Sequence, residues 1–429
     1  MNKIYNPNRK DWSKLLERPT KTVEDIEATV LTVFDEVKLE GDKAISRYTQ
    51  RFDQVELKEV MVSSSEIEEA KLLVSNELKN AIKVAKSNIE KFHAAQKTEK
   101  VSIETVDGVS CWQEKRPIQK VGLYIPGGTA PLFSSILMLA IPANLAGCKE
   151  VVLCSPPNKE GKINPAILYT ADLCGVTKIC KVGGIQAIAA MTFGTESIPQ
   201  VYKIFGPGNQ FVTVAKQLAT KFGVAIDMPA GPSELLVVAD DTANPGFVAS
   251  DLLSQAEHGK DSQVILITTS KGIIEKVEQE VEQQLLDLPR KEIAEAAIKN
   301  SKLIYVENDQ EALDIINEYG PEHFIVCIKN EEYYVENIVN AGSVFIGNYT
   351  PESAGDYASG TNHTLPTNGY AKQYSGVNLD SFMKSMTFQK ISKKGIKSIG
   401  NAIELMAEAE GLQAHKNAVT LRLESLKDE

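Results

Sequence analysis

The chain has 429 residues, which is too long for a single hydrophobic core, so length alone predicts two or more domains. Its 46 Lys and Arg residues stand against 57 Asp and Glu residues, and the net charge of −11 argues against nucleic acid and against an anionic membrane surface as partners. The chain start lacks the apolar core of a secretory signal and no apolar run is long enough to span a bilayer, so a cytoplasmic location is expected.

Residues 1–104 are rich in charged helix formers and are expected to form a helical N-terminal extension. Ser65 and Glu68 match a capping box, and apolar residues from Ile67 to Phe92 recur with the period of one helix. His93 lies in the same charged stretch and looks incidental. The extension is therefore predicted to provide packing surface and to carry no chemistry.

Residues 105–239 are expected to form a first α/β module, because short β-branched runs alternate there with glycine turns and helix-forming segments. Strand runs followed by glycine turns occur at 121–125, 179–182 and 201–205. The turns could hold phosphates at helix N-termini, or they could be structural only. The turn from Gly206 lacks the third glycine of the GxGxxG fingerprint, so a standard dinucleotide-binding loop is not predicted.

Residues 240–380 are expected to form a second α/β module, joined to the first by the polar, turn-rich stretch 240–245. A second series of apolar runs predicts strands at 235–238, just before this stretch, and at 264–268, 303–306, 324–328 and 344–346. Residues 381–429 are expected to form a helical C-terminal dimerisation tail with an apolar stripe. The predicted fold class is therefore α/β, with two tandem modules between helical N- and C-terminal extensions.

Four of the five histidines lie in short segments crowded with carboxylates, side-chain amides and glycines. These segments are 255–259, 320–323, 355–363 and 410–415. Imidazole, carboxylate and amide oxygen are the groups that bind a borderline divalent metal such as zinc. Imidazole beside carboxylate is also the usual general-base pair, so these segments are the candidates for chemistry.

The segments at 255 and 356 are the candidates for metal binding. Gln255 and His258 are three residues apart at the end of a helical pattern, so both can reach one ion. The alternative is that His258 caps its own helix. Asp356 lies in a stretch that appears too glycine-rich for a helix, and such polar loops often carry function. Its alternative role is to close an Asx turn.

The two remaining segments are candidates for proton transfer and for contact with another subunit. Glu322 and His323 precede an apolar strand, where a side chain can enter a cleft and act as a base, or where both can be ordinary strand-end residues. Glu410 and His415 lie in the helical C-terminal region. A helix there could deliver them to a neighbouring subunit's site, or they could form a solvated helix face.

With these segments in place, the chain resembles the histidinol dehydrogenases, which oxidise L-histidinol to L-histidine with two NAD in histidine biosynthesis. The resemblance covers nearly the whole chain. Its motifs lie at 121–128, 182–187, 204–209, 226–234, 254–259, 319–323, 354–356, 359–363 and 410–415. The resemblance implies a pair of incomplete Rossmann-like modules flanked by helical extensions.

The resemblance also implies a set of site residues. Zinc would be held by Gln255, His258 and Asp356 of one subunit and by His415 of its partner, so the site would exist only in a homodimer. Glu322 and His323 would be the acid–base pair, and together with the zinc ligands they would line the substrate site. Further contacts implied are Ser233, His363 and Glu410 with substrate, and Tyr124, Gln186 and Asn209 with NAD.

Two other classes of function stay open. A related dehydrogenase for a different small alcohol would keep the metal ligands and His323, although His363 and Glu410 together suit the imidazole and ammonium of histidinol. A non-enzymatic dimer stapled by zinc would bind the metal without reducing NAD.

Overall fold

The computed structural model describes residues 1–19, 24–127 and 131–427, so Gly128 of the first expected glycine turn lies outside the described residues. The chain folds into two compact units. The first comprises Met1–Gln96 and Ile118–Phe382, and the second comprises Lys97–Pro117 and Met383–Glu429. Within the described residues, no helix has the length and apolar character needed to cross a membrane.

The first α/β module is built on a five-stranded parallel sheet with the order β6-β5-β4-β7-β8. Its strands are β4 (Lys120–Tyr124), β5 (Glu150–Cys154), β6 (Lys178–Cys180), β7 (Lys203–Phe205) and β8 (Ala225–Ile226). Its helices are α6 (Ser134–Ala146), α7 (Pro165–Leu173), α8 (Gly184–Phe193) and α9 (Gln210–Lys221). Counted within the module, the strand order is 3-2-1-4-5, the Rossmann order without its sixth strand.

The second module repeats this order in a six-stranded parallel sheet, β1-β11-β10-β9-β12-β13. Its strands are β1 (Asn2–Tyr5), β9 (Glu234–Ala239), β10 (Gln263–Thr268), β11 (Lys302–Tyr305), β12 (His323–Cys327) and β13 (Ser343–Ile346). Its helices are α10 (Pro245–Ala256), α11 (Lys271–Leu285), α12 (Lys291–Lys299), α13 (Asp309–Tyr319), α14 (Glu331–Asn337) and α15 (Glu352–Tyr357). Strand β1, which the sequence did not predict, pairs with β11 at the sheet edge.

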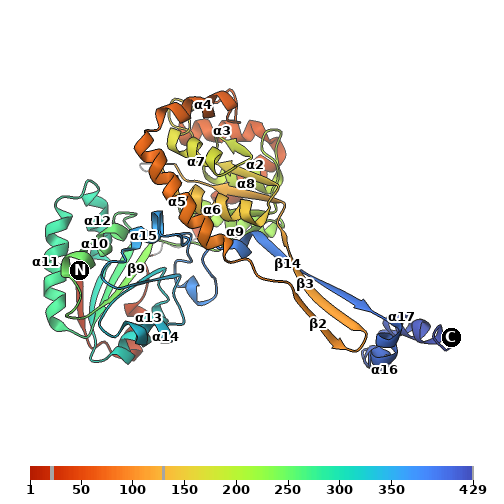
Figure 1. Ribbon diagram of the computed structural model, residues 1–429. Helices are drawn as coiled ribbons and strands as arrows, with labels where there is room; N and C mark the ends of the chain where they lie inside the picture. The colour runs from red at the N-terminus through yellow and green to blue at the C-terminus, as the bar shows by residue number, and fades with distance from the viewer. Residues whose placement is uncertain (20–23, 128–130, 428–429) are drawn as a thin grey trace. The chain divides into compact units, whose positions relative to one another are not determined.

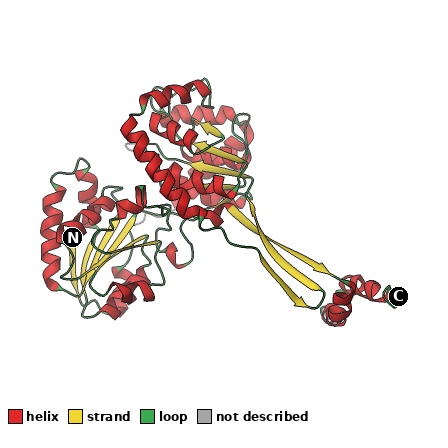
Figure 2. Cartoon of the chain, in the orientation of Figure 1, coloured by secondary structure: helices red, strands yellow, loops and turns green. Residues whose placement is uncertain are grey.

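Both faces of the second sheet are covered by helices, as Figure 2 shows. Along β9, Leu235 and Val237 pack into one hydrophobic cluster while Leu236 and Val238 pack into another. A strand buried on both faces reads as a continuous apolar run, which explains why the strands of this series were recognisable in the sequence. The prediction of two incomplete Rossmann-like modules is confirmed.

The turn 240–245, expected to join the modules, lies inside the second one. Asn244 caps α10 by accepting a hydrogen bond from the N–H of Gly246, and Pro245 takes the first helical position. The polar residues of this turn therefore start a helix. The chain passes from the first sheet to the second between β8 and β9.

The N-terminal extension is helical from Arg9 to Ala94 within the described residues, but residues 101–104, also expected in it, belong to a strand, and the single long helix predicted from Ile67 to Phe92 is wrong. Helices α4 (Ser64–Leu73) and α5 (Asn76–Ala94) are separate, because Val74 is extended and Ser75 caps α5. The capping box uses Ser63 and Glu66, one of two overlapping Ser-x-x-Glu patterns in the sequence. The other helical elements of the extension are η1 (Arg9–Asp11), α1 (Trp12–Leu15), α2 (Glu24–Glu40) and α3 (Asp42–Asp53).

The second unit is formed by two distant parts of the chain. Strands β2 (Val101–Val106), β3 (Val109–Pro117) and β14 (Met383–Ile391) form an antiparallel sheet in the order β14-β3-β2 (Figure 1). Residues 383–391 were expected to be helical; they form a strand because β3 offers them a partner along their whole length. Helices α16 (Lys393–Ala409) and α17 (Gln413–Glu424) complete the unit. Two short 3-10 helices, η2 (Tyr370–Lys372) and η3 (Leu379–Phe382), belong to the first unit.

Candidate active site and metal centre

The acid–base candidates lie at the amino ends of the central strands of the second sheet. Strand β12 begins at His323, which stands in register with Leu235 of β9. Open α/β sheets usually bind ligands at the carboxyl ends of their strands. Here α10 runs back from the carboxyl end of β9 and ends at Ala256, which brings Gln255 to the amino ends.

The backbone of Glu234 contacts both members of the acid–base pair. Its N–H donates to Oε2 of Glu322 at 2.9 Å, and its carbonyl oxygen lies 3.1 Å from Nδ1 of His323. Nδ1 of His323 also lies 3.7 Å from Oε2 of Glu322. Nε2 of His323 is buried and has no hydrogen-bond partner within the described part of the chain, so it is the ring nitrogen available for chemistry.

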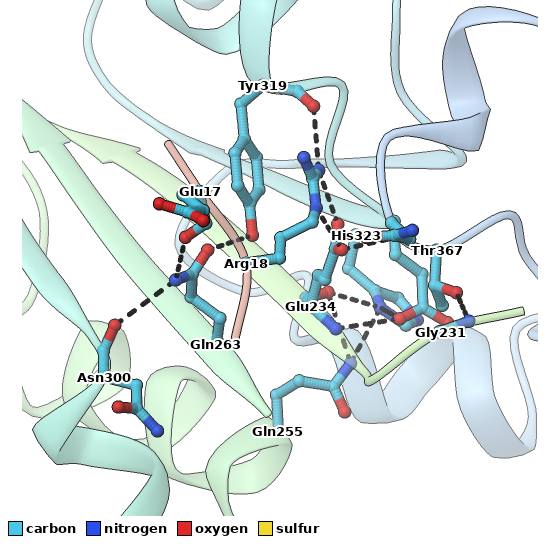
Figure 3. Close-up of polar contacts among 12 residues, drawn as sticks. Glu17, Arg18, Gly231, Glu234, Gln255, Gln263, Asn300, Tyr319, His323 and Thr367 are labelled. Atoms are coloured by element: carbon cyan, nitrogen blue, oxygen red, sulfur yellow. Dashed lines mark hydrogen bonds and ion pairs between the residues drawn. The ribbon is translucent and has the colours of Figure 1, made fainter. Parts of the chain in front are cut away.

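Gln255 contacts this cluster through its amide nitrogen, while its amide oxygen has no hydrogen-bond partner among the described residues. Its Nε2 lies 2.8 Å from Nδ1 of His323 and 3.4 Å from the carbonyl oxygen of Glu234 (Figure 3). Its Oε1 is buried and has no partner among the residues that the structure describes. A buried acceptor without a donor is costly unless a ligand or ion completes it.

Asp356 lies on a short helix, α15, in a segment that was expected to be a loop. Helical spacing places Glu352 one turn before it, and the segment ends at Tyr357 before the glycine-rich part begins. Oδ1 of Asp356 lies 3.6 Å from Nε2 of His323. The potential ligand atoms of His323, Glu352 and Asp356 all lie within 4.8 Å of one another. The sequence analysis missed Glu352, although its i, i+4 spacing from Asp356 was visible.

The cluster holds an excess of buried carboxylates. Burial raises the pKa of Glu322 and that of Glu352 to about 8. Burial lowers the pKa of His323, but the carboxylates of Glu352, Glu322 and Asp356 outweigh this effect and raise it to about 10. Burial opposes ionisation of Asp356, yet the neighbouring imidazoles keep its pKa below the ordinary value. A bound cation would offset this concentration of negative charge.

Two further histidines border the cluster. His258 follows α10 with an exposed side chain, and desolvation by neighbouring atoms lowers its pKa although Asp356 opposes the effect. Nδ1 of His363 lies 2.8 Å from the carbonyl oxygen of Asp356, and its Nε2 lies 3.1 Å from Oγ of Ser135. Burial lowers the pKa of His363, so the neutral ring is favoured. Ser135, on α6, is a second residue that the sequence analysis missed.

The donors of this cluster fit a borderline divalent ion. Gln255 offers an unpartnered amide oxygen, Asp356 a carboxylate and His258 an imidazole, which is the form of nitrogen ligand that zinc prefers. Three protein ligands would leave a coordination position for a further group.

The remaining expected substrate contacts lie in two places. Ser233 is half-buried directly before β9, and its carbonyl oxygen accepts a hydrogen bond from the N–H of Gln263 at 3.1 Å. In the second unit, Glu410 is the C-cap residue of α16 and His415 lies in the first turn of α17. Both of these side chains are exposed within that unit, and their roles stay predictions.

His93, which looked incidental in the sequence, is fully buried in α5. Its Nδ1 lies 2.8 Å from the carbonyl oxygen of Ile89, and its Nε2 lies 3.3 Å from Nδ2 of Asn362. Asn362 also donates to the carbonyl oxygen of Met138 at 2.6 Å. His93 therefore supports the segment that carries His363.

The three residues expected to contact NAD line one cavity of about 1000 Å³ in the first unit. Tyr124 ends β4, and its hydroxyl accepts a hydrogen bond from the N–H of Gly184, the first residue of α8, at 3.0 Å. Asn209 caps α9. Both amide atoms of Gln186 are buried without a partner in the described part of the chain. The lining thus includes two helix N-termini, which suit phosphate groups.

The cavity lies where the strand order of the first sheet reverses, between β4 and β7. Gly206 follows β7 with a φ of +122°, and a Cβ at this position would meet the carbonyl oxygen of Tyr124. Only glycine permits this approach of the two strand ends, so the turn is built for close backbone packing at the cavity.

Comparison with known proteins gives a consistent result. A family model described as histidinol dehydrogenase matches residues 16–423. The histidinol dehydrogenase of Bacteroides thetaiotaomicron is 60% identical over 427 residues, covering 100% of both chains. That of Escherichia coli K12 is 54% identical and covers 97% of this chain and 96% of its own. The crystal structure of histidinol dehydrogenase from Elizabethkingia anophelis superposes with a TM-score of 0.98 at 60% identity, covering 100% of this chain and 99% of that chain.

Proposed function

The chain belongs to the histidinol dehydrogenase family and is an oxidoreductase, and from this premise we propose that it converts L-histidinol to L-histidine through L-histidinaldehyde. Two NAD would accept the hydrides, in the cytoplasm, as the last step of histidine biosynthesis. The observation that carries the proposal is a pair of buried atoms that lack a partner among the described residues: Nε2 of His323, and Oε1 of Gln255, whose amide nitrogen lies 2.8 Å from Nδ1 of the same ring.

The proposed metal is zinc, with Gln255, His258 and Asp356 as ligands from one subunit and His415 from a second copy of the chain. Bound zinc would anchor and orient the imidazole and amine of the substrate near the nicotinamide. The excess of buried carboxylates supports a cation at this place. Exposed apolar side chains of the second unit support a homodimer: Val101, Ile103, Leu405, Met406 and Leu421.

In the first half-reaction, Nε2 of His323 would take the proton of the substrate hydroxyl while hydride leaves carbon for the first NAD. A bound cation would offset the carboxylates that raise the pKa of His323, so that the neutral ring becomes available, and Nε2, which has no hydrogen-bond partner among the described residues, would be the nitrogen that acts as the base. The product is the aldehyde, and the proton rests on His323.

In the second half-reaction, Glu322 would take a proton from water as the water oxygen adds to the aldehyde carbon, and His323 would return its proton to the aldehyde oxygen, which gives the hydrate. The neutral His323 would then accept a proton from the hydrate while hydride leaves for the second NAD, which gives the carboxylic acid and, after loss of its proton to solvent, the carboxylate. Burial raises the pKa of the thiols of Cys148, Cys174 and Cys327 to about 12, and a group with so little thiolate is a poor nucleophile. These three thiols are therefore poorly suited to forming a thioester, which supports the proposal of a hydrate.

The test is NADH formation with L-histidinol, followed by the two half-reactions in variants. His323→Asn should lower the rate of both half-reactions by about a hundredfold or more, because both need the same base. Glu322→Gln should spare alcohol oxidation and slow aldehyde oxidation. Oxidation of the aldehyde by Glu322→Gln at the parent rate would refute the role of Glu322 in activating water.

A chelator supplies the matching test for the metal. Its removal of zinc should abolish turnover, and added zinc should restore it. Metal binding without NADH formation from histidinol would mean that the metal only stabilises the structure, and the proposed activity would be wrong.

A further inference from the structure

We infer that Arg18, in the N-terminal extension, is a positioning residue that holds Glu322 and His323 in place through Glu234. The inference rests on the proposed function, and it assigns a role in the reaction to a part of the chain that the sequence suggested was packing only. Arg18 precedes α2 and lies in the first unit with the cluster.

The guanidinium of Arg18 donates two parallel hydrogen bonds to the carboxylate of Glu234. Nε lies 2.5 Å from Oε1 and Nη2 lies 3.0 Å from Oε2 (Figure 3). The Arg18 side chain is 13% exposed and that of Glu234 is 1% exposed, so water screens this pair little. A two-pronged contact fixes the direction of a carboxylate as well as its charge.

Arg18 is itself held rigidly. Nη2 also donates to the carbonyl oxygen of Tyr319 at 2.8 Å, and the guanidinium lies 4.0 Å from the centroid of the Tyr319 ring. The Tyr319 hydroxyl donates to Oε1 of Gln263 at 2.9 Å, and Nε2 of Gln263 donates to the carbonyl oxygen of Glu17 at 3.1 Å. This network, drawn in Figure 3, fixes both the side chain of Arg18 and the backbone before it.

Glu234 is the link between Arg18 and the acid–base pair. Its side chain takes the two contacts from Arg18 and a third hydrogen bond from the N–H of Asn368 at 2.7 Å. Its main chain gives N–H to Glu322 and its carbonyl to His323, at 2.9 and 3.1 Å. A movement of Glu234 therefore displaces the proton-transferring groups of both half-reactions together.

Loss of Arg18 would leave the carboxylate of Glu234 buried without its cation. A buried charge that loses its partner is strongly unfavourable, so the first residue of β9 should shift toward another donor or toward water. Displacements of about 1 Å at reacting groups lower rates by about a hundredfold, which is larger than the effect expected on substrate binding.

The experiment uses the full-length, zinc-loaded protein with Arg18→Met, Arg18→Lys and the control Arg47→Met. Arg47 lies in the same N-terminal extension and also contacts two carboxylates, Glu36 and Glu40, at an exposed site. The measurements are kcat and KM for L-histidinol, zinc per subunit, and the dissociation constant of histidinol by calorimetry.

Arg18→Met should lower kcat about tenfold to a hundredfold in both half-reactions, while zinc content and histidinol affinity stay within about twofold of the parent. Arg18→Lys keeps the positive charge but cannot make both parallel contacts with the carboxylate of Glu234, so its kcat should lie between those of Arg18→Met and the parent. Arg47→Met should match the parent.

A second variant separates positioning from general damage to the fold. Glu234→Gln should also lower kcat, and the double variant with Arg18→Met should be no slower than the slower single variant, because both changes break one link. Additive losses, an Arg18→Met kcat within twofold of the parent, or a loss that follows zinc content would overturn the inference. A parent protein that forms no NADH from histidinol would overturn the proposed function first, and the inference with it.

Discussion

Replacement of Asp251 by asparagine should stabilise the protein, and increasingly so as the pH rises. Asp251 lies in α10, one turn before Gln255, and is only 8% exposed. Its carboxylate has no ion-pair partner among the described residues, and burial raises its pKa from 3.8 to about 7. The ionised form is thus disfavoured in the folded protein.

The magnitude follows from the two pKa values. Below the unfolded pKa of 3.8 the group is protonated in both states and costs nothing. Between 3.8 and the folded pKa of about 7 the folded protein holds a proton that the unfolded chain releases, so the cost grows with pH, and above about 7 it stays constant. The difference of about 3 corresponds to about 4 kcal/mol lost at pH 8.5, against about 2 kcal/mol at pH 5.5. Asparagine removes this dependence, so its advantage over the parent should grow by about 2 kcal/mol between these pH values.

Urea unfolding at pH 5.5 and pH 8.5, with equal protein concentrations because the protein is proposed to be dimeric, measures this difference. Asp287→Asn is the matched control, because Asp287 is exposed and its replacement should leave the free energy of unfolding close to that of the parent. An equal advantage of Asp251→Asn at both pH values would refute the reasoning, as would a lower stability than the parent at pH 8.5.

Two further predictions concern the shared site and the cavity. If His415 reaches a second subunit, His258→Ala and His415→Ala should each be inactive, yet refolded mixtures should regain about a quarter of parental activity, because half the dimers carry one intact site; no recovery would contradict a shared site. Gly206→Ala should weaken NAD binding about tenfold or more by forcing the Tyr124 carbonyl aside, measurable by titration of nucleotide fluorescence; unchanged NAD affinity with an intact fold would contradict this.

The order of strands and helices was predictable because each βα unit carries its own local signal. Strands such as β9 and β10 are buried on both faces and therefore read as uninterrupted apolar runs. Where two local signals overlap, the residue that caps the helix was not predictable. Ser63 and Ser65 both begin a Ser-x-x-Glu pattern, and in the fold the backbone is extended at Ser63, so that α4 begins at Ser64. Strand β14 depends on a partner strand far away in the chain.

The candidate site was visible in part. Short motifs identified Gln255, Glu322, His323 and Asp356 as candidates, and the fold brings these four residues into one cluster. Their position at the amino ends of the strands could not be foreseen, because it depends on how α10 returns along the sheet.

The residues that the sequence did not reveal act through long-range contacts. Ser135 meets His363, and Arg18 meets Glu234, across more than two hundred residues in each case. No local pattern marks an arginine in a charged extension as a partner of a buried glutamate. Glu352 differs, because its spacing from Asp356 would have indicated it had the segment been recognised as helical.

The second unit is assembled from two separate segments of the chain, Lys97–Pro117 and Met383–Glu429, and this has a practical consequence. Strand β14 covers one edge of the hairpin β2–β3 over nine residue pairs. Shortening the protein after Phe382 would therefore do more than remove a tail, because it would leave the β3 edge of the hairpin without its partner, while Val101 and Ile103 are already exposed on β2 at the other edge. Unpaired strand edges of this kind pair with the strands of other chains, so such a fragment should aggregate during expression.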